Sequence, residues 1–600
     1  MRILFDSQQA QYKTPFGTLC PGQICQLHIH IPASVGAMGA ECILDFADGM
    51  PGVVTPLTKE CTDGAYDIFS GTFILDQPGL YFYYFRICKP DGSFRLFKQG
   101  HDTNMEAGDK WQLSCIPADF TTPDWAKGAV IYQVFPDRFC KVGDPDLNGK
   151  ITPYTIHKNW DEEVHWQPDE QGEILNNDFY GGNFRGITEK MDYIASLGTE
   201  ILYLNPISKS FSNHRYDTGD YKIPDPMLGT LEDFRALCDA AHKRNIKVIL
   251  DGVYSHTGSR STYFASACKS PGSPYYSWYT FYEYPGRYNS WWGFKTLPTV
   301  NKMDRAFRDF IIHNEDSVVA HWLNAGADGF RLDVVDELPD AFVLELKNRI
   351  RQIRPDALLI GEVWEDASNK ISYNIRRRYF VDGILDACMN YPFRTAILDF
   401  LRGWDDGNRL KETVMTIAEN YPPQVLACNM NLLGSHDTPR ILTALVDDFN
   451  GSREDAAQRR LSDRQKQQAK QLLLLASFLQ YTLPGAPSIY YGDEAGMEGH
   501  KDPFNRRTYP WGKEDEALLA HYQALGQLKR NYQALRQGDI HFSENCCGRL
   551  GFTRRFGNEK LHIYMNRSHE PWDLPKGTAL LSQNLQGSTL MPMGFSIMED

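Results

Sequence analysis

Gly-Phe-Arg-Leu-Asp-Val-Val-Asp-Glu, residues 329–337, begins as a short apolar strand and ends in a charged cluster. Arg331 stands two residues before Asp333, so a strand here would hold the carboxylate beside a fixed cation. A neighbouring cation favours the ionised form and lowers the pKa of the carboxyl group, which makes Asp333 a candidate nucleophile. On its own, an Arg-x-Asp pair is more often a structural salt bridge.

Short apolar strands recur on both sides of this segment and alternate with stretches of helical patterning. Alternation of this kind predicts βαβ units and a parallel sheet. The expected strands are Val130–Phe135, Glu200–Leu204, Lys247–Leu250, Gly329–Leu332, Ala357–Ile360, Gly383–Ala387, Asn431–Leu433 and Pro487–Tyr490. Eight such runs predict an α/β fold, a closed (β/α)8 TIM barrel.

Segments with strand-like patterning and turn residues flank the barrel pattern at both ends. Residues 1–117 predict an N-terminal β-sandwich domain, and a polar, proline-containing linker follows. The barrel is expected over 118–537, with a subdomain at about 254–301 inserted after the third strand, because that stretch is too long for a βα loop. Residues 538–600 predict a small C-terminal β domain. Most aromatics of the insertion, up to Trp292, are expected in its own core.

Composition excludes several classes of partner and location. A formal net charge of −14 argues against nucleic acid, which is bound mainly by basic surface. The most apolar run, Leu472–Leu479, is too short to cross a membrane. Thirteen scattered Cys without a CxxC array indicate neither a zinc site nor a disulfide framework. Because no signal peptide is apparent, a cytoplasmic location is expected.

Charged residues gather where the predicted strands end. The third strand ends at Asp251 with His256 shortly after, the fifth at Glu362 and the seventh at His436 and Asp437. Catalytic groups of a TIM barrel lie at the C-terminal ends of its strands, so these side chains should converge.

Three carboxylates without metal-ligand spacing suit glycoside hydrolysis. In a retaining mechanism one carboxylate attacks the anomeric carbon and a second acid protonates the leaving oxygen. Asp333 is the expected nucleophile. Glu362 is the expected acid, because an apolar setting beside Val363 and Trp364 would raise its pKa. Asp437 would hold the sugar hydroxyls, and no cofactor is required for this chemistry.

Four segments together resemble the conserved regions of the α-amylase family, glycoside hydrolase family 13. They are Asp-Gly-Val-Tyr-Ser-His at 251–256, Gly-Phe-Arg-Leu-Asp at 329–333, Gly-Glu-Val-Trp at 361–364 and Ser-His-Asp at 435–437. Within the family, the chain most resembles the neopullulanase, cyclomaltodextrinase and maltogenic amylase group. That group adds an N-terminal β domain to the barrel.

The resemblance implies an enzyme that cleaves α-1,4-glucosidic bonds in maltooligosaccharides, cyclodextrins, starch or pullulan with retention. Asp333 would be the nucleophile, Glu362 the acid/base and Asp437 the transition-state stabiliser. The implied substrate contacts are Tyr216 as a stacking platform, His214, Asp251, His256, Arg331, His436, Asp502 and Arg506, with Glu337 and Trp364 beyond the cleaved bond. A homodimer through the N-terminal domain is a further expectation.

Two departures from the family pattern are informative. Ser255 replaces the Asn usual before the histidine, which is a tolerated polar change. Asp336 and Glu337 stand where plain α-amylases often carry Lys-His, which favours the neopullulanase-like group.

A structural calcium ion is a separate expectation. The loop at 143–149 resembles a calcium-binding arrangement of this group, with Asp144, Asn148 and the downstream Asn183 as oxygen ligands. The same loop sequence is also that of a simple turn.

Two other functions stay open on the sequence alone. One is an α-1,6-cleaving, pullulanase-type or transglycosylating member of the same family, whose barrel would be identical. The other is a non-catalytic carbohydrate-binding homologue, because a fold does not by itself imply activity. Such a homologue would be expected to have lost one of the three carboxylates, and all three are present.

Overall fold

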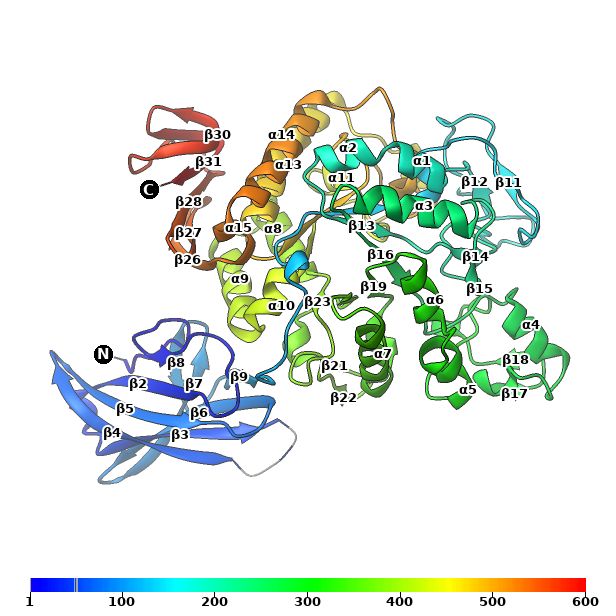
Figure 1. The fold of residues 1–600 in the computed structure, drawn as a ribbon. Coiled ribbons are helices and arrows are strands. Elements are labelled where there is room, and N and C mark those ends of the chain that lie inside the picture. Colours follow the sequence, from blue (N-terminus) through cyan, green and yellow to red (C-terminus); the bar gives the residue numbers. More distant parts are fainter. Residues whose placement is uncertain (1, 48, 50–51, 600) are drawn as a thin grey trace. The chain divides into compact units, whose positions relative to one another are not determined.

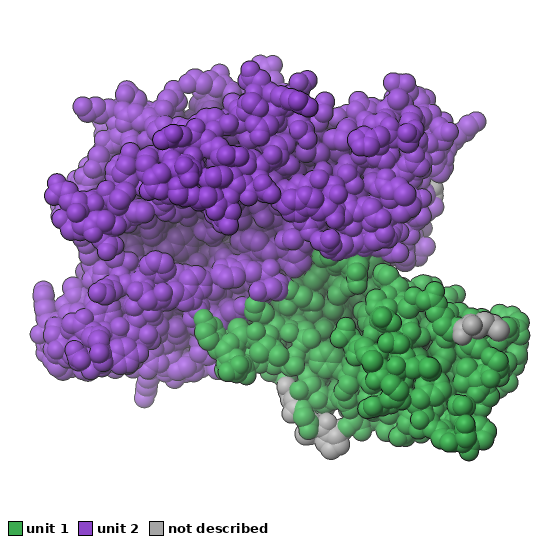
Figure 2. Space-filling view, turned by 180° about the vertical axis from the view of Figure 1, so that it is seen from behind, with its two compact units in different colours: residues 1–121, 366–386, 412–426 green, residues 122–365, 387–411, 427–600 purple. Residues whose placement is uncertain are grey.

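The structure is a computed structural model that describes residues 2–47, 49 and 52–599 (Figure 1). The chain forms two compact units, coloured separately in Figure 2. Unit 1 comprises Met1–Thr121, Asp366–Asp386 and Glu412–Leu426, and unit 2 comprises Thr122–Glu365, Ala387–Lys411 and Ala427–Asp600. The domain boundaries predicted after residues 117 and 537 stay predictions.

Antiparallel strands build unit 1. They are β1 (Lys13–Thr14), β2 (Ile24–Pro32), β3 (Gly39–Phe46), β4 (Val53–Asp63), β5 (Tyr66–Ile74), β6 (Gly79–Lys89), β7 (Gly92–Gln99), β8 (Asp102–Met105) and β9 (Trp111–Cys115). The first half of β4 pairs with β3 and its second half with β5, so β4 joins two sheets. Side chains such as Ile29 and Phe85 form a common core. The predicted N-terminal sandwich is confirmed.

Parallel strands of unit 2 form the barrel. They are β10 (Ile131–Val134), β13 (Ile201–Leu204), β16 (Lys247–Gly252), β19 (Gly329–Leu332), β20 (Leu358–Gly361), β23 (Ala387–Cys388), β24 (Met430–Leu432) and β25 (Ala486–Tyr490). They pair in the order β23-β20-β19-β16-β13-β10-β25-β24. A parallel bridge between Met389 and Met430 joins the two ends of this sheet. The predicted (β/α)8 barrel is confirmed, with its weakest closure beside the very short β23.

Helices lie around this sheet and follow its strands along the chain (Figure 1). The longer ones are α3 (Leu231–His242), α6 (Val318–Ala325), α7 (Asp340–Ile353), α8 (Tyr391–Arg402), α13 (Asp463–Thr482) and α14 (Glu516–Asn531). Inside the barrel, apolar side chains from several strands, including Ile131, Ile249 and Ile360, form one buried cluster. This core holds the strand ends in fixed register, which the site requires.

The segment between β16 and β19 carries helix α4 (Thr262–Lys269) and a hairpin of β17 (Phe281–Glu283) and β18 (Arg287–Tyr288). Trp278 and Tyr279 are buried within it, as expected for its own core. Trp292 differs, because 52% of its surface is exposed.

The C-terminal strands form an antiparallel sheet in unit 2, as predicted. They are β26 (Asp539–Glu544), β27 (Arg549–Phe556), β28 (Glu559–Asn566), β29 (Trp572–Asp573), β30 (Thr578–Gln586) and β31 (Thr589–Glu599). In the described part of the chain, no helix combines the length and the apolar character that a membrane crossing needs.

Replacing Gly329 by Ala should destabilise the barrel. A Cβ at this position would lie 2.2 Å from the carbonyl oxygen of Leu358 on the paired strand β20, so the two strands would have to separate. We expect a loss of about 1–3 kcal/mol, the usual cost of overpacking. Thermal unfolding measures it, with Gly286→Ala as control because a Cβ there meets nothing within 4 Å. Equal melting temperatures for the two variants would contradict the argument.

Candidate active site

The carboxylates predicted from the strand ends converge on one arginine. Arg331 lies in β19, fully buried, and the parallel register places Asp251 of β16 directly beside it. Its Nη1 donates to Asp251 Oδ1 at 2.7 Å and to Asp333 Oδ1 at 3.2 Å, and its Nη2 donates to Glu362 Oε2 at 2.6 Å. Burial lowers the pKa of Arg331, but Asp251 and Glu362 raise it well above its ordinary value, so the guanidinium stays charged.

The pKa of Asp333 departs from the sequence-based expectation. Burial raises it well above the usual range, Arg331 lowers it, and repulsion from Glu362 and Asp251 raises it further. The expected net lowering is therefore wrong, because one guanidinium is shared by three carboxylates in a site largely closed to water. Such a coupled cluster titrates as a set and can hold a proton near neutral pH.

Glu362 also lies in a setting that differs from the expected apolar one. Besides Arg331, the backbone N–H of Val334 donates to its Oε2 at 2.8 Å, and the Trp364 indole donates to its Oε1 at 3.0 Å. Val334 adopts a φ of +33°, which is strained for a β-branched residue. This strained turn directly after Asp333 aims the backbone donor at Glu362.

Tyr216 connects the cluster to the seventh strand end. Its hydroxyl donates to Asp251 Oδ2 at 2.7 Å and lies 2.6 Å from His436 Nε2. Gln133 donates to His436 Nδ1 at 3.0 Å, which assigns the imidazole proton to Nε2. Burial, with the nearby arginines, lowers the pKa of His436, so it is a neutral donor. The Tyr216 ring stacks on His436 with 5.3 Å between centroids.

The two other predicted histidines, His256 and His214, form hydrogen bonds with the backbone of Tyr216. His256 is buried, with Nε2 at 3.1 Å from the Tyr216 carbonyl and Nδ1 at 2.8 Å from the Ser255 hydroxyl. Both ring nitrogens are thus engaged, and the sugar contact predicted for His256 has no open nitrogen in this structure. His214 accepts from the backbone N–H of Tyr216 at 3.1 Å. Burial lowers the pKa of each ring to about 3.

Asp437 approaches the same ring nitrogen of His436 as the Tyr216 hydroxyl, with its Oδ2 at 3.0 Å from Nε2. Arg506 pairs with Asp502 at 2.9 Å and with Asp437 at 3.5 Å. Desolvation by the surrounding protein and repulsion from Glu362 raise the pKa of Asp437 to about 7, and Arg506 opposes the rise. Its side chain is nevertheless 45% exposed at the barrel mouth.

Trp292 is a candidate site residue that the sequence analysis assigned to the core. Its indole donates to Glu337 Oε1 at 2.8 Å, and its ring lies 6.0 Å from that of Trp364 and 3.9 Å from that of Trp291. The backbone at Trp292 has a φ of +50°. The sequence carried no signal for this placement, because Trp292 lies far from Glu337 and Trp364 along the chain and one exposed ring cannot be told from the core rings of an aromatic-rich insertion.

Two of the three predicted calcium ligands are engaged elsewhere, and the third, Asn148, is exposed. The Asn183 amide oxygen caps helix α1 (Phe184–Glu189) by accepting from Gly186 N at 2.8 Å, and its nitrogen donates to the Val142 carbonyl. Asp144 is exposed and pairs with Lys141 at 3.0 Å. As they lie, these side chains do not fit a calcium site, and calcium stays a prediction through which no chemical step runs.

Comparison with known proteins adds an independent finding. The family model described as "Alpha amylase, catalytic domain" matches residues 133–536. A cyclomaltodextrinase from Geobacillus thermopakistaniensis is 32% identical over 87% of this chain and 83% of its own length. The type III pullulan hydrolase from Thermococcus kodakarensis has a similar structure, with a TM-score of 0.70, 26% identity and full coverage of both chains.

An amylopullulanase from Thermoanaerobacter thermohydrosulfuricus is 37% identical over 83% of this chain. The chain spans only 36% of that protein, and 29% and 46% of two further amylopullulanases.

Replacing Asp437 by Asn should stabilise the fold at pH 8. The pKa of Asp437 is raised to about 7 in the folded chain from about 4 in an unfolded one, so the folded state loses stability as pH rises between these values. The neutral amide removes that loss. We expect a gain of about 1 kcal/mol, because solvent screens a half-exposed group, and no difference below about pH 4. Thermal unfolding at both pH values tests this, and a pH-independent difference would contradict it.

Proposed function

The chain belongs to the α-amylase family, and from that premise we propose that it is a retaining hydrolase of α-1,4-glucosidic bonds. The observation that carries the proposal is the cluster in which Arg331 contacts Asp251, Asp333 and Glu362. It brings a nucleophile and an acid/base to adjacent strand ends, which is what double displacement at a sugar requires.

The hydrogen bonds define which oxygen of each carboxylate reacts. Arg331 holds Asp333 Oδ1, while no described residue donates to Oδ2, so Oδ2 attacks the anomeric carbon. Two donors hold Glu362 Oε2, whereas the Trp364 indole is the single described donor to Oε1, so Oε1 carries the proton to the leaving oxygen. The same oxygen then accepts a proton from the water that releases the sugar, which completes retention.

Electrostatics at the mouth suit the transition state. Positive charge develops on the sugar ring as the bond breaks, and the carboxylates of Asp333 and Asp437, 9% and 45% exposed, are open to it. Asp251 is fully buried and acts through Arg331 and Tyr216. The Tyr216 ring offers an aromatic face beside them. The pair of Arg506 with Asp502 supplies hydrogen-bonding groups for hydroxyls. His436 is buried and orients Tyr216 and Asp437 through its Nε2.

Maltooligosaccharides, cyclodextrins, starch and pullulan are the proposed substrates. Relatives named cyclomaltodextrinase, neopullulanase and maltogenic α-amylase support this choice. An α-1,6-cleaving or transglycosylating enzyme is the second candidate, because amylopullulanases are also similar to the chain. A non-catalytic homologue is disfavoured by the intact carboxylate cluster.

Three further points belong to the proposal. All thirteen cysteines are free thiols, which supports a reducing, cytoplasmic location. A homodimer through the N-terminal domain and a structural calcium ion are proposed on the family resemblance alone.

Replacing Asp333 by Asn should abolish turnover while leaving the fold intact. The amide cannot form the covalent intermediate, so we expect kcat on starch to fall on the order of 10⁴-fold or more. Asp356→Asn is a matched control, because that carboxylate precedes β20, away from the strand ends, and is 56% exposed. Activity retained in the Asp333 variant, with an unchanged melting temperature, would overturn the assignment of the nucleophile.

Product analysis on pullulan separates the two catalytic candidates. Cleavage of α-1,4 bonds releases panose, and cleavage of α-1,6 bonds releases maltotriose. We expect panose, together with hydrolysis of starch and cyclodextrin in parallel reactions, measured by chromatography. Maltotriose as the main product would favour the second candidate, and background reducing sugar on every α-glucan would favour the non-catalytic one.

A further inference from the structure

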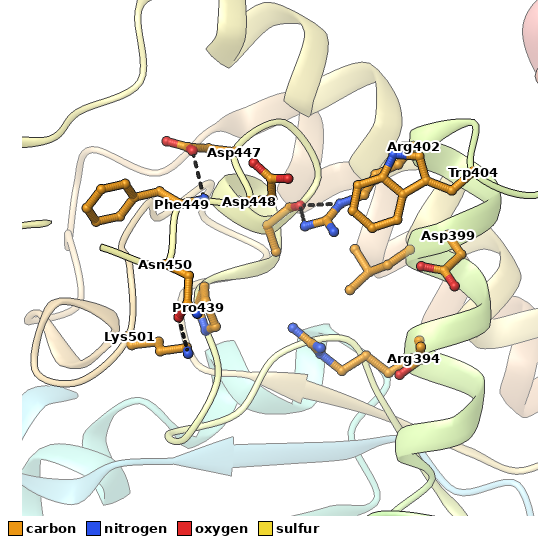
Figure 3. Close-up of a pocket in the computed structure, with 13 residues that line it drawn as sticks. Arg394, Asp399, Arg402, Trp404, Pro439, Asp447, Asp448, Phe449, Asn450 and Lys501 are labelled. Carbon is orange, nitrogen blue, oxygen red and sulfur yellow. Dashed lines mark hydrogen bonds between the residues drawn. The ribbon is translucent and has the colours of Figure 1, made fainter. Parts of the chain in front are cut away.

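A pocket separate from the carboxylate cluster lies beside helix α8 (Figure 3). It is formed by one flank of this helix, residues 439–450 after β24, and Lys501 after β25. Its volume is about 430 Å³, within the range of small-molecule sites. All of these residues belong to unit 2.

An exposed tryptophan, Trp404, forms one wall of this pocket. Helix α8 ends at Gly403, whose φ of +84° turns the chain, and Trp404 N then donates back to the Asp399 carbonyl at 2.9 Å. The Arg402 guanidinium lies 4.7 Å from the Trp404 ring centroid, and its Nε donates to the Ala444 carbonyl at 2.9 Å. The ring is therefore held in place from within the protein while 55% of the residue's surface remains exposed.

Arg394 supplies donors that are open to a ligand. Its Nε donates to the Leu433 carbonyl at 2.8 Å, and neither Nη group donates to any described residue. Figure 3 shows its side chain reaching from α8 into the pocket. Burial lowers the pKa of Arg394, Arg402 lowers it further, and Tyr391 and Asp493 oppose the shift. On the opposite side, Lys501 donates to the Asn450 amide oxygen at 2.7 Å, and Asp448 is exposed.

The lining carries groups of both signs, so a ligand that both donates and accepts hydrogen bonds fits it. Asp399 is paired with Arg409 at 2.8 Å and Asp447 with Arg459 at 2.6 Å. This leaves the exposed Asp448 as the open carboxylate opposite Arg394, Arg402 and Lys501. A polyanion would meet this carboxylate, whereas a polyhydroxylated ring can donate to it and accept from guanidinium groups. The apolar C–H face of such a ring can pack on an amphipathic aromatic side chain.

The pocket is continuous with the chain segments of the active site. Pro439 follows Asp437 by two residues, and Lys501 directly precedes Asp502. A neighbouring hollow of about 180 Å³ shares Phe449, Asn450 and Lys501 with the pocket and extends to Asp502. A ligand in the pocket can thus belong to the same molecule that occupies the carboxylate cluster.

We propose that this pocket is a second α-glucan-binding site, in which Trp404 stacks on a glucose ring and Arg394 and Asp448 bind hydroxyls of a distal part of a long or branched chain. The inference rests on the proposed function and deepens it, because it makes polysaccharide the preferred substrate class.

Trp404→Ala tests the site by comparing substrates of different length. On amylopectin kcat/KM should fall roughly three- to tenfold through KM, the effect of one lost aromatic contact, while on maltotriose it should stay within about twofold. Asp448→Ala should likewise lower kcat/KM on amylopectin more than kcat/KM on maltotriose. Phe556→Ala, which removes an aromatic that is 44% exposed in the C-terminal sheet, is the matched control and should change neither value.

Each of the other outcomes would contradict the proposed second α-glucan-binding site. An equal fall on both substrates would mean that Trp404 acts on the fold or the catalytic centre, and no fall on either would mean that the pocket binds no glucan. Competition of inorganic phosphate with amylopectin, lost in Trp404→Ala, would mean that the pocket is an anion site. If the wild-type protein cleaves no α-glucan, the proposed function fails instead, and this is visible before any variant is made.

Discussion

One buried guanidinium, Arg331, organises the chemistry of this protein. It contacts carboxylates from three consecutive barrel strand ends, at distances between 2.6 and 3.2 Å. Uncompensated charges in such a place are costly, and loss of one partner from a buried ion pair typically costs about 3–5 kcal/mol. The arrangement is therefore tolerated only while the barrel keeps its strands in register. The strained Val334 turn and the Tyr216 network both depend on that register.

The same arginine explains how a compact acidic site can supply both a nucleophile and an acid. It leaves one oxygen of Asp333 and one oxygen of Glu362 for the reaction, and it holds the other oxygen of each. Because the carboxyl groups share a single cation, they compete for ionisation, and the cluster can keep a proton near neutral pH. Retaining hydrolysis needs one ionised and one protonated carboxyl group at the same moment.

The sequence predicted the barrel and the identity of the clustered residues well, because strand ends of a parallel barrel meet at one rim whatever the loops do. It did not predict their environments. The net pKa of Asp333 depends on how many carboxylates share Arg331, and the donors on Glu362 include a backbone group exposed by a strained turn. Nor could the sequence show that Ser255 and the Tyr216 carbonyl engage the ring nitrogens of His256, whose sugar contact stays a prediction. The sequence did not indicate a binding role for Trp404, because that role depends on α8 ending beside loops that are distant in sequence.

Trapping the covalent intermediate tests the central claim most directly. A 5-fluoro α-glucosyl fluoride slows formation and hydrolysis of a glycosyl-enzyme, and peptide mass spectrometry then locates the label. The account predicts a label on Asp333, with the α-anomer released first when a natural substrate is followed by NMR. A label on Glu362 or Asp437, or initial release of the β-anomer, would contradict the account.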